Sequence, residues 1–349
     1  MSFLNVVLPL GSSVLSFVFA AMVFDQWLQR RHSFQLVWAI GLVWYGISAG
    51  CEFVGSAFGW NQPLYRTWYL IGAFFVAAYL GAGSIYLLRK SRFGYFAGVT
   101  VLIGGTLSLL FSHLNARGTH TPLYPGAGTA GTVAFVVTLI GGIAIIAATA
   151  WRRPLAAHIF MGVLVVGSLA AAYLVFTAAL PAPGWALDPG THAPVGSAFP
   201  GYVRVLTGPF NIAGALCLVF GAIYSAYVYM PKHKVLRAKV RTPVLAQLYG
   251  AAAVAVNMIA SLPGAVVALL AGKLNSRVPA TILIAAGAFI PGVTSGLNRF
   301  GVTWSFFLGE FLGVLLIFAG FLVSEEVFRN IRVGVTIWSR RSSFKSELG

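Results

Sequence analysis

Long runs of uncharged, apolar residues recur along almost the whole of this 349-residue chain. Several runs are about 20 residues or longer, which is enough for an α-helix to cross about 30 Å of hydrocarbon. Only 9% of the residues are charged, whereas an ordinary soluble domain has about 25%. The sequence therefore predicts an all-α, polytopic integral membrane protein without a large soluble domain.

The pattern predicts eight spans with approximate boundaries, followed by an ambiguous region and a last clear span. The eight lie at roughly 6–27, 35–58, 67–88, 95–113, 129–150, 156–180, 205–229 and 244–271, and the last at roughly 302–323. The segment near 279–300 starts apolar, but Pro291, Gly292 and Gly296 then interrupt it. We expect this segment to be broken or re-entrant, which gives about nine transmembrane helices; ten full spans are the alternative.

The basic residues account for a net charge of +16 and fall in short runs between the spans. Runs of this kind mark cytoplasmic loops and do not indicate a nucleic-acid surface. They predict an integral plasma (inner) membrane protein, prokaryotic-like, with its N-terminus outside. Nine spans keep the basic C-terminus in the cytoplasm, whereas ten would place it outside.

Two regions follow from this topology. Residues 1–323 form a single transmembrane helical domain, and residues 324–349 form a basic, amphipathic cytoplasmic tail. We expect the tail to lie on the inner leaflet and to attract anionic lipid. A docking site for a protein partner is the alternative.

Two acidic residues, Glu52 and Glu310, lie inside apolar spans of a chain with only seven acidic residues. An acid within a membrane span indicates a functional site by default, because an ionised carboxylate is costly in hydrocarbon. In the nine-span topology both residues lie about 9–12 Å below the outer surface. They are therefore predicted to share one level of the membrane.

Other polar residues are expected near that level, namely Arg66, Arg299, Asn211 and Asn298. A buried carboxylate needs a proton or a partner, and arginine is well suited to be that partner. The hypothesis is an outer-facing polar cluster that binds a small solute or ion. The alternative is that arginine–glutamate pairs only lock helices together. Glycines four residues apart, as at Gly46 and Gly50, favour close helix packing around the acids.

A Gly-Thr-His-x-Pro pattern occurs in two connections on the same predicted side, at His120 and at His192. Two imidazoles on ordered loops can bind a metal ion such as zinc or copper. However, Gly, Thr and Pro are also common turn residues, so ordinary loop structure is an alternative interpretation. A pH-responsive role is a third.

Aromatic residues cluster at the span ends, which is typical of the membrane interface. This interpretation covers Trp27, Trp60, Tyr65, Trp68, Tyr69, Trp151, Tyr227 and Tyr229. Trp44 and Tyr45 lie deeper, on the span that carries Glu52, where they line a cavity or simply pack.

A weak internal repeat aligns the third and seventh spans at an offset of 138, matching Ala77 with Ala215 and Gly83 with Gly221. It suggests a 4+4 parallel repeat, which is a feature of some transporters.

The residues favour a transporter or channel-like protein for a small polar solute, an ion or a proton. The alternative is a non-catalytic accessory or structural subunit of a larger membrane complex, or a membrane sensor. No P-loop, zincin motif or lysine within a span is present, so an enzyme is disfavoured and no cofactor is strongly indicated.

Overall fold

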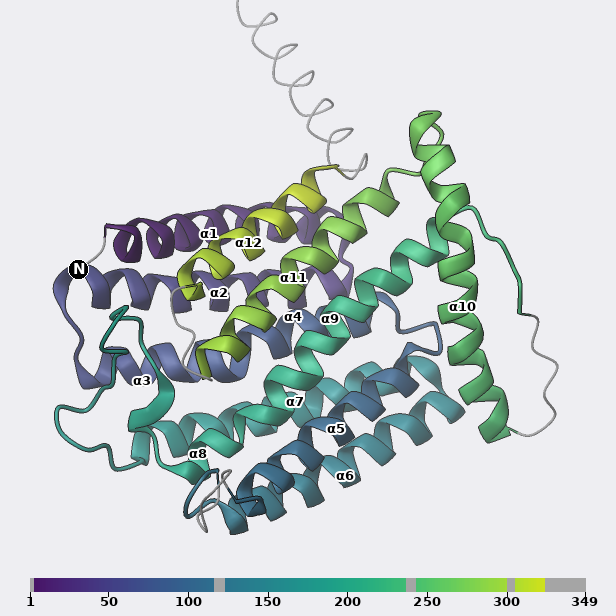
Figure 1. Ribbon diagram of the computed structural model, residues 1–349. Coiled ribbons are helices and arrows are strands. Elements are labelled where there is room, and N and C mark those ends of the chain that lie inside the picture. Colours follow the sequence, from purple (N-terminus) through teal and green to yellow (C-terminus); the bar gives the residue numbers. More distant parts are fainter. Residues whose placement is uncertain (1–2, 116–122, 237–242, 300–304, 324–349) are drawn as a thin grey trace, which may run out of the picture. The chain divides into compact units, whose positions relative to one another are not determined.

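The computed structural model describes residues 3–115, 123–236, 243–299 and 305–323 (Figure 1). Within these ranges the protein is all-α, contains no strand, and has ten helices long and apolar enough to span a membrane. The predicted class is confirmed: this is a multi-pass membrane protein whose helices contact the lipid bilayer. Helices suit this environment because each one satisfies its own backbone hydrogen bonds.

The helices follow the predicted spans closely through the first seven. In chain order they are α1 (Leu4–Arg30), α2 (Ser33–Phe58), α3 (Gln62–Leu70), α4 (Val76–Leu87), α5 (Phe93–His113), α6 (Gly128–Trp151), α7 (Arg153–Thr177), α8 (Gly201–Val205), α9 (Thr207–Tyr229), α10 (Pro243–Leu270), α11 (Arg277–Arg299) and α12 (Phe306–Val323). A π-helix, η1 (Ile71–Phe75), joins α3 to α4, and a short 3-10 helix, η2 (Gly196–Ala198), precedes α8.

The chain divides into two compact units. Unit 1 contains Met1–Gly221 and Ala286–Leu316, and unit 2 contains Ala222–Ala285 and Ile317–Gly349. The predicted single domain over 1–323 stays a prediction. The tail 324–349 lies outside the described residues, so its binding to anionic lipid also stays a prediction.

In unit 1, α4 and α9 pack in parallel through small residues. A Cβ on Gly81 would lie 2.3 Å from the carbonyl oxygen of Gly214, and a Cβ on Gly214 would lie 2.4 Å from the backbone of Ala77. About two turns further along α9, Gly221 faces Ser84. The two spans aligned by the weak repeat are therefore neighbours, although the repeat itself stays a prediction.

The prediction of a broken segment near 279–300 is wrong, because α11 is one helix that continues through Pro291. A proline is tolerated in a membrane helix where neighbouring groups compensate for the lost backbone bond. Gly313 of α12 leaves room for the proline ring, since a Cβ there would lie 2.2 Å from the Pro291 Cγ atom. The Thr294 hydroxyl also turns inward, donating to the carbonyl oxygens of Ile290 and Pro291 at 3.2 and 3.3 Å.

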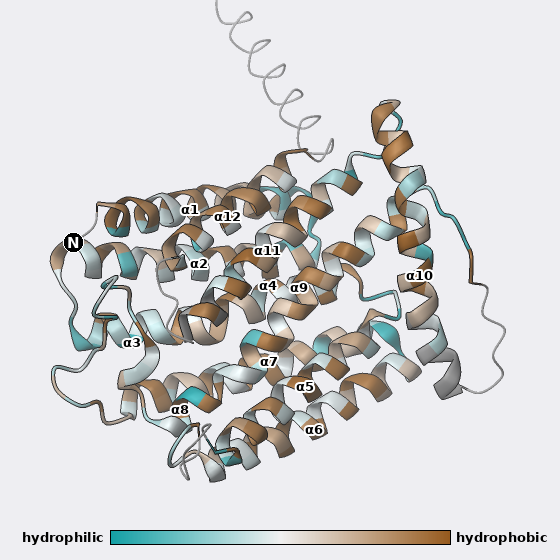
Figure 2. Cartoon of the chain, in the orientation of Figure 1, coloured by the Kyte–Doolittle hydropathy of each residue, from teal (hydrophilic) through white to brown (hydrophobic). Residues whose placement is uncertain are grey.

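Much of the helix ribbon is coloured toward the hydrophobic end of the scale (Figure 2), and many large apolar side chains are exposed. On α7, for example, Val166, Leu169 and Tyr173 are each 69% exposed. Exposed apolar surface of this extent indicates contact with lipid rather than water. The core lies between the helices, and in unit 1 it contains most of the buried polar residues described below.

Candidate functional site

The turn between α2 and α3 places Glu52 opposite Trp68. Helix α2 ends at Gly59, whose φ of 98° is a backbone conformation that glycine adopts without strain. Asn61 then caps α3, with its side-chain oxygen accepting from the Leu64 N–H at 2.9 Å, and a proline follows in the first turn. The two helices run antiparallel from this turn, so positions equally far from it in sequence lie side by side.

Glu52 is fully buried, with none of its surface exposed. The indole N–H of Trp68 donates to its Oε1 atom at 2.7 Å. The other carboxyl oxygen, Oε2, has no hydrogen-bond donor among the described residues. One oxygen of a deeply buried carboxyl group is therefore held and the other is left for a further partner.

The carboxyl group of Glu310 is the charged neighbour of Glu52, because the two side chains are close enough to interact electrostatically. The hydroxyl of Tyr45 donates to the backbone carbonyl of Glu310 at 2.7 Å, which ties the first turns of α12 to α2. Phe311 packs against α1 at Gly11. Glu310 itself is only partly buried, so it is the more accessible member of the pair.

The predicted meeting of the two acids is therefore found in the structure, at one end of unit 1. The end of α2 and the start of α12 meet there, and we call this the Glu52 end. Small residues let the helices approach, as predicted: Gly46 faces Phe17, and Gly50 faces Ser13, whose hydroxyl donates to the Gly46 carbonyl at 2.8 Å. Helix contact through glycine is common in membranes because backbones can then approach closely.

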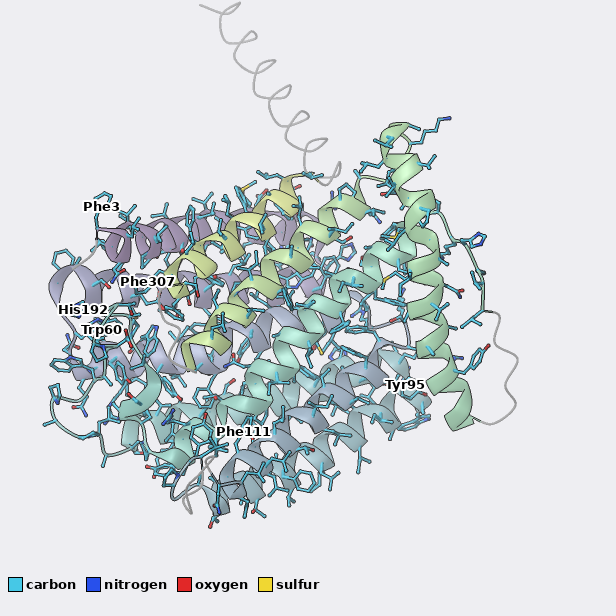
Figure 3. The ribbon with its side chains drawn as sticks, in the orientation of Figure 1. Phe3, Trp60, Tyr95, Phe111, His192 and Phe307 are labelled. Carbon is cyan, nitrogen blue, oxygen red and sulfur yellow. The ribbon has the colours of Figure 1, made fainter. Side chains whose placement is uncertain are left out.

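An aromatic cluster fills the Glu52 end of unit 1. Tyr69 stacks on Phe199 with ring centroids 4.2 Å apart, and Tyr65 also stacks with Phe199 at 5.4 Å. Trp60 meets Trp68 edge to face at 5.9 Å, and a Cβ on Gly55 would clash with the Trp60 ring. Figure 3 labels Trp60, Phe307 and His192, which lie at this same end.

The prediction that these aromatics form an interfacial belt is wrong for five of them, because protein surrounds their side chains. These five, between 0% and 9% exposed, are Trp60, Tyr65, Trp68, Tyr69 and Tyr227. Trp151, by contrast, is 85% exposed, which suits an interfacial residue. Position near a span end did not distinguish these two environments, since both place an aromatic at the same depth.

The π-helix η1 follows Trp68, the partner of Glu52, closely in the chain. Within it, Gly72 approaches the Ser48 hydroxyl of α2, and Phe75 packs against Trp44 with ring centroids 5.3 Å apart. The Trp44 indole nitrogen is buried and has no hydrogen-bond partner among the described residues. Single π-turns within α-helices occur often at functional sites, because they shift the side chains that follow.

Arg66 does not pair with either glutamate, contrary to the expected cluster. Its guanidinium group donates to the backbone carbonyls of Val175 and, at 2.7 Å, Ala178, which lie at the C-terminal end of α7. A cation is favourable there because the last carbonyls of a helix carry partial negative charge. Arg66 is 8% exposed, so this contact joins α3 to α7 inside the protein.

The other predicted site residues contribute less to the described geometry. Asn211 is partly buried in α9 and, within the described residues, makes no hydrogen bond with either glutamate. Asn298 and Arg299 belong to the last turn of α11, and their side chains lie outside the described part of the structure. Their membership of the site stays a prediction.

The histidine loops give no metal site within the described residues. His192 is exposed in a loop that Asp188 organises, with the carboxylate accepting from the Thr191 N–H at 2.8 Å and from its hydroxyl at 2.9 Å. No group of three or more His, Cys, Asp or Glu side chains there could hold a metal ion. His120 lies outside the described residues, so its pairing with His192 stays a prediction.

Sequence reasoning missed Trp68 and assigned no specific contact to Tyr45. A signal for Trp68 was present: Glu52 and Trp68 are equally far from position 60, in the turn between two antiparallel helices. Tyr45 gave no such signal, because its partner Glu310 is 265 residues away.

The geometry thus defines a helical membrane protein with a buried carboxyl pair and no cation bound to it among the described side chains. Such a pair can hold a proton or bind a small cation. No family model, curated protein or solved structure matches this chain, so any functional conclusion rests on this geometry.

Proposed function

We propose that this protein is a transporter or channel-like membrane protein in which the Glu52–Glu310 pair binds a proton or a small cation. The observation that carries the proposal is that the carboxyl groups of Glu52 and Glu310 are close enough to interact within the helical domain. Ionised carboxylates have only acceptor atoms, so two of them side by side are stabilised by a shared proton or by a cation.

Electrostatics support a bound proton or cation. Two negative charges about 4 Å apart repel by about 4 kcal/mol even at an effective dielectric constant of about 20. The indole N–H of Trp68 offsets part of the charge on Glu52, but the Oε2 atom has no donor among the described residues. A proton or a small cation between the carboxyl groups satisfies this oxygen and removes the repulsion.

The binding of Arg66 to backbone carbonyls leaves the two acids without this arginine as a partner, which favours positively charged ligands at the site. The expected arginine–glutamate cluster would have been neutral or basic and suited to an anionic solute. Because Arg66 binds backbone carbonyls instead, the described surroundings of the pair are acidic and aromatic. These surroundings favour a cation or a proton over an anion.

The positive-inside rule supports an N-terminus outside and a plasma-membrane location, which places the Glu52 end in the outer half of the bilayer. In this orientation the partly exposed Glu310 is the side from which an ion reaches the fully buried Glu52.

Dicyclohexylcarbodiimide tests the pair directly, because this apolar reagent modifies protonated carboxyl groups in membrane interiors. We expect a mass increase on Glu310 near neutral pH, with less on Glu52, and protection by an excess of lithium or sodium ions if a cation binds there. The variants Glu52→Gln and Glu310→Gln should lower the labelling at least tenfold while the protein stays folded. Asp25→Asn is the matched control, because Asp25 is an exposed acid of α1 whose loss should leave the labelling unchanged.

Transport is then measured with vesicles that contain a pH-sensitive dye. We expect proton flux above that of empty vesicles and its loss in both glutamine variants. The alternatives, an accessory or structural subunit or a sensor, predict a different pattern: no flux, no labelling, and glutamine variants that lose stability or fail to assemble with a partner. That pattern would refute the proposal.

A further inference from the structure

Helix α10 has an unusual position in unit 2, because the helices before and after it meet. The guanidinium of Arg277, the first residue of α11, donates to the hydroxyl of Tyr229, the last residue of α9, at 2.5 Å. It also lies 4.8 Å from the centre of the Tyr229 ring. Met230 and Val278 belong to one buried cluster. The end of α9 and the start of α11 are therefore at the same level of the membrane.

The middle of α10 is bound to the loop that follows α9. The side-chain oxygen of Asn257 accepts from the N–H groups of Val235 and Leu236, each at 2.8 Å, and its amide donates to the Leu236 carbonyl at 3.0 Å. One turn later the Ser261 hydroxyl accepts from the His233 N–H at 2.9 Å. Asn257 stands at the centre of the 28-residue helix.

This contact makes a transmembrane position for α10 unfavourable. If α10 crossed the bilayer, its centre would lie in the middle of the hydrocarbon, and the bound loop would lie there with it. That loop carries Lys232 and Lys234, both exposed, and continues in sequence to Arg237. A lysine at the bilayer centre costs about 2.5–3.5 kcal/mol. A position of the α10 centre near the headgroups avoids this cost.

The end of α10 also turns back at once. Gly272, with φ of 66°, and Lys273 close a Schellman motif, donating to the carbonyls of Leu269 at 3.0 Å and Ala268 at 2.8 Å. Asn275 then accepts from the Arg277 N–H at 2.9 Å and starts α11. The chain therefore returns directly to the junction of α9 and α11, and Figure 1 shows α10 crossing the ends of these two helices.

The side chains of α10 that the structure describes outside this contact are mostly apolar and exposed. Its protein-facing side is a narrow stripe of Ala253, Asn257, Ser261 and Ala265, all less than 9% exposed. Outside this stripe, side chains such as Ile259, Val267 and Leu270 are 64%, 67% and 83% exposed. Apolar surface of this extent in water would be strongly unfavourable, so α10 does not project into the solvent.

We propose that α10 lies in the plane of the membrane, with its exposed apolar side in the acyl chains and with Lys232, Lys234 and Lys273 bound to anionic lipid headgroups. An in-plane helix of this kind combines apolar burial with electrostatic attraction to the leaflet. The partner is the anionic leaflet that faces the basic loops.

The proposal accounts for an independent observation in unit 1. Glu52 and Glu310 can meet near the ends of α2 and α12 only if the chain crosses the membrane an even number of times between them. With α10 in the plane, the crossings between them are α3 with α4, α5, α6, α7, α9 and α11. The protein then has nine crossings. The helix that does not cross the membrane is α10, rather than the predicted segment near 279–300.

A labelling experiment on the full-length protein tests the topology. Lys234→Cys precedes α10 and Lys273→Cys follows it, and both positions are exposed, whereas the native Cys51 and Cys217 are buried. A membrane-impermeant maleimide should label both variants from the same face of sealed vesicles. His192→Cys, in the loop between α7 and α8, should react from the opposite face and serves as the reference. Labelling of the two lysine positions from opposite faces would overturn the proposal.

A depth measurement tests the lipid contact. A fluorophore on Ile259→Cys should be quenched at least twofold by brominated acyl chains in vesicles of phosphatidylethanolamine and phosphatidylglycerol. Ala265→Cys, on the buried stripe, should show no quenching. Quenching of Ile259→Cys by aqueous iodide alone, or by neither agent, would show that water or protein covers the helix and would contradict the proposal.

The contact between the lysines and the lipid headgroups is tested by thermal unfolding. The melting temperature should rise when nanodiscs of phosphatidylcholine are replaced by nanodiscs containing phosphatidylglycerol. The triple variant with Lys232, Lys234 and Lys273 changed to Gln should lose most of this shift. An unchanged shift would contradict the role of these lysines.

Discussion

Two buried charged sites of unit 1 differ in how far their hydrogen bonds are satisfied. The Arg66 guanidinium is held by the protein itself, because it donates to two backbone carbonyls at the end of α7. Glu52 and Glu310 form a pair of like groups, and one oxygen of Glu52 has no donor among the described residues. A cation held by backbone carbonyls at a helix end stabilises the fold, whereas a pair of like acids with a free acceptor oxygen can exchange a proton or an ion.

This difference separates the two interpretations that the sequence left open. The structural lock is the arginine, and its partner is backbone rather than a glutamate. The candidate binding site is the acid pair, which relies on Trp68 and Tyr45 for orientation. Stability and ion binding should therefore respond to different substitutions.

The largest effect is expected for Arg66→Gln. The shorter side chain leaves the Val175 and Ala178 carbonyls without their charged donor, which should lower the free energy of unfolding by about 2–4 kcal/mol. Chemical unfolding in detergent micelles measures this change. Arg152→Gln, an exposed arginine before α7, is the control and should have little effect. If Arg66→Gln abolished carbodiimide labelling without loss of stability, the contrast between lock and site would be wrong.

A smaller effect is expected for Tyr45→Phe, which removes the hydroxyl bound to the Glu310 carbonyl. A hydrogen bond of this kind contributes about 0.5–1.5 kcal/mol, and the unfolding free energy should fall by that amount. Labelling of Glu310 should also change, because α12 loses its tie to α2. Tyr173→Phe, which is 69% exposed on α7, should leave both measurements unchanged. An equal response of the two variants would show that the Tyr45 contact is not specific.

The smallest expected effect is the coupling energy between Arg66→Gln and Glu52→Gln, measured in a double-mutant cycle. The two side chains have different partners, so their effects on unfolding should add to within about 0.5 kcal/mol. The cycle between Glu52→Gln and Glu310→Gln should instead show a coupling energy of about 0.5–3 kcal/mol, as for residues in contact. A strong coupling of Arg66 to Glu52 would instead support the alternative suggested by the sequence, in which an arginine–glutamate pair holds the helices together.

Local sequence features predicted the helices well and their partners poorly. The turn after α2 could be read from Gly59, Asn61 and the following proline, because caps and turns depend on a few neighbouring residues. The break expected at Pro291 did not occur, because Gly313 of another helix makes room for the ring. Compensation by a residue 22 positions away is invisible to a local reading.

The site shows the same division. The two glutamates could be selected as a pair from their apolar surroundings and their predicted depth. The choice of Arg66 as partner failed because helix rotation and register determine which group a long side chain reaches. Trp68 was assigned to the membrane interface although it is buried, since depth alone does not say which way a side chain faces.

The sequence by itself determined that this chain is a multi-pass helical membrane protein with two exceptional acids. Span length, charge position and turn residues are properties of short segments, and the membrane converts them directly into helices. Only the tertiary structure decided that Glu52 and Glu310 meet, that Arg66 binds the end of α7, and that the neighbours of α10 lie together. These facts depend on contacts between residues far apart in the chain, which packing and register establish together.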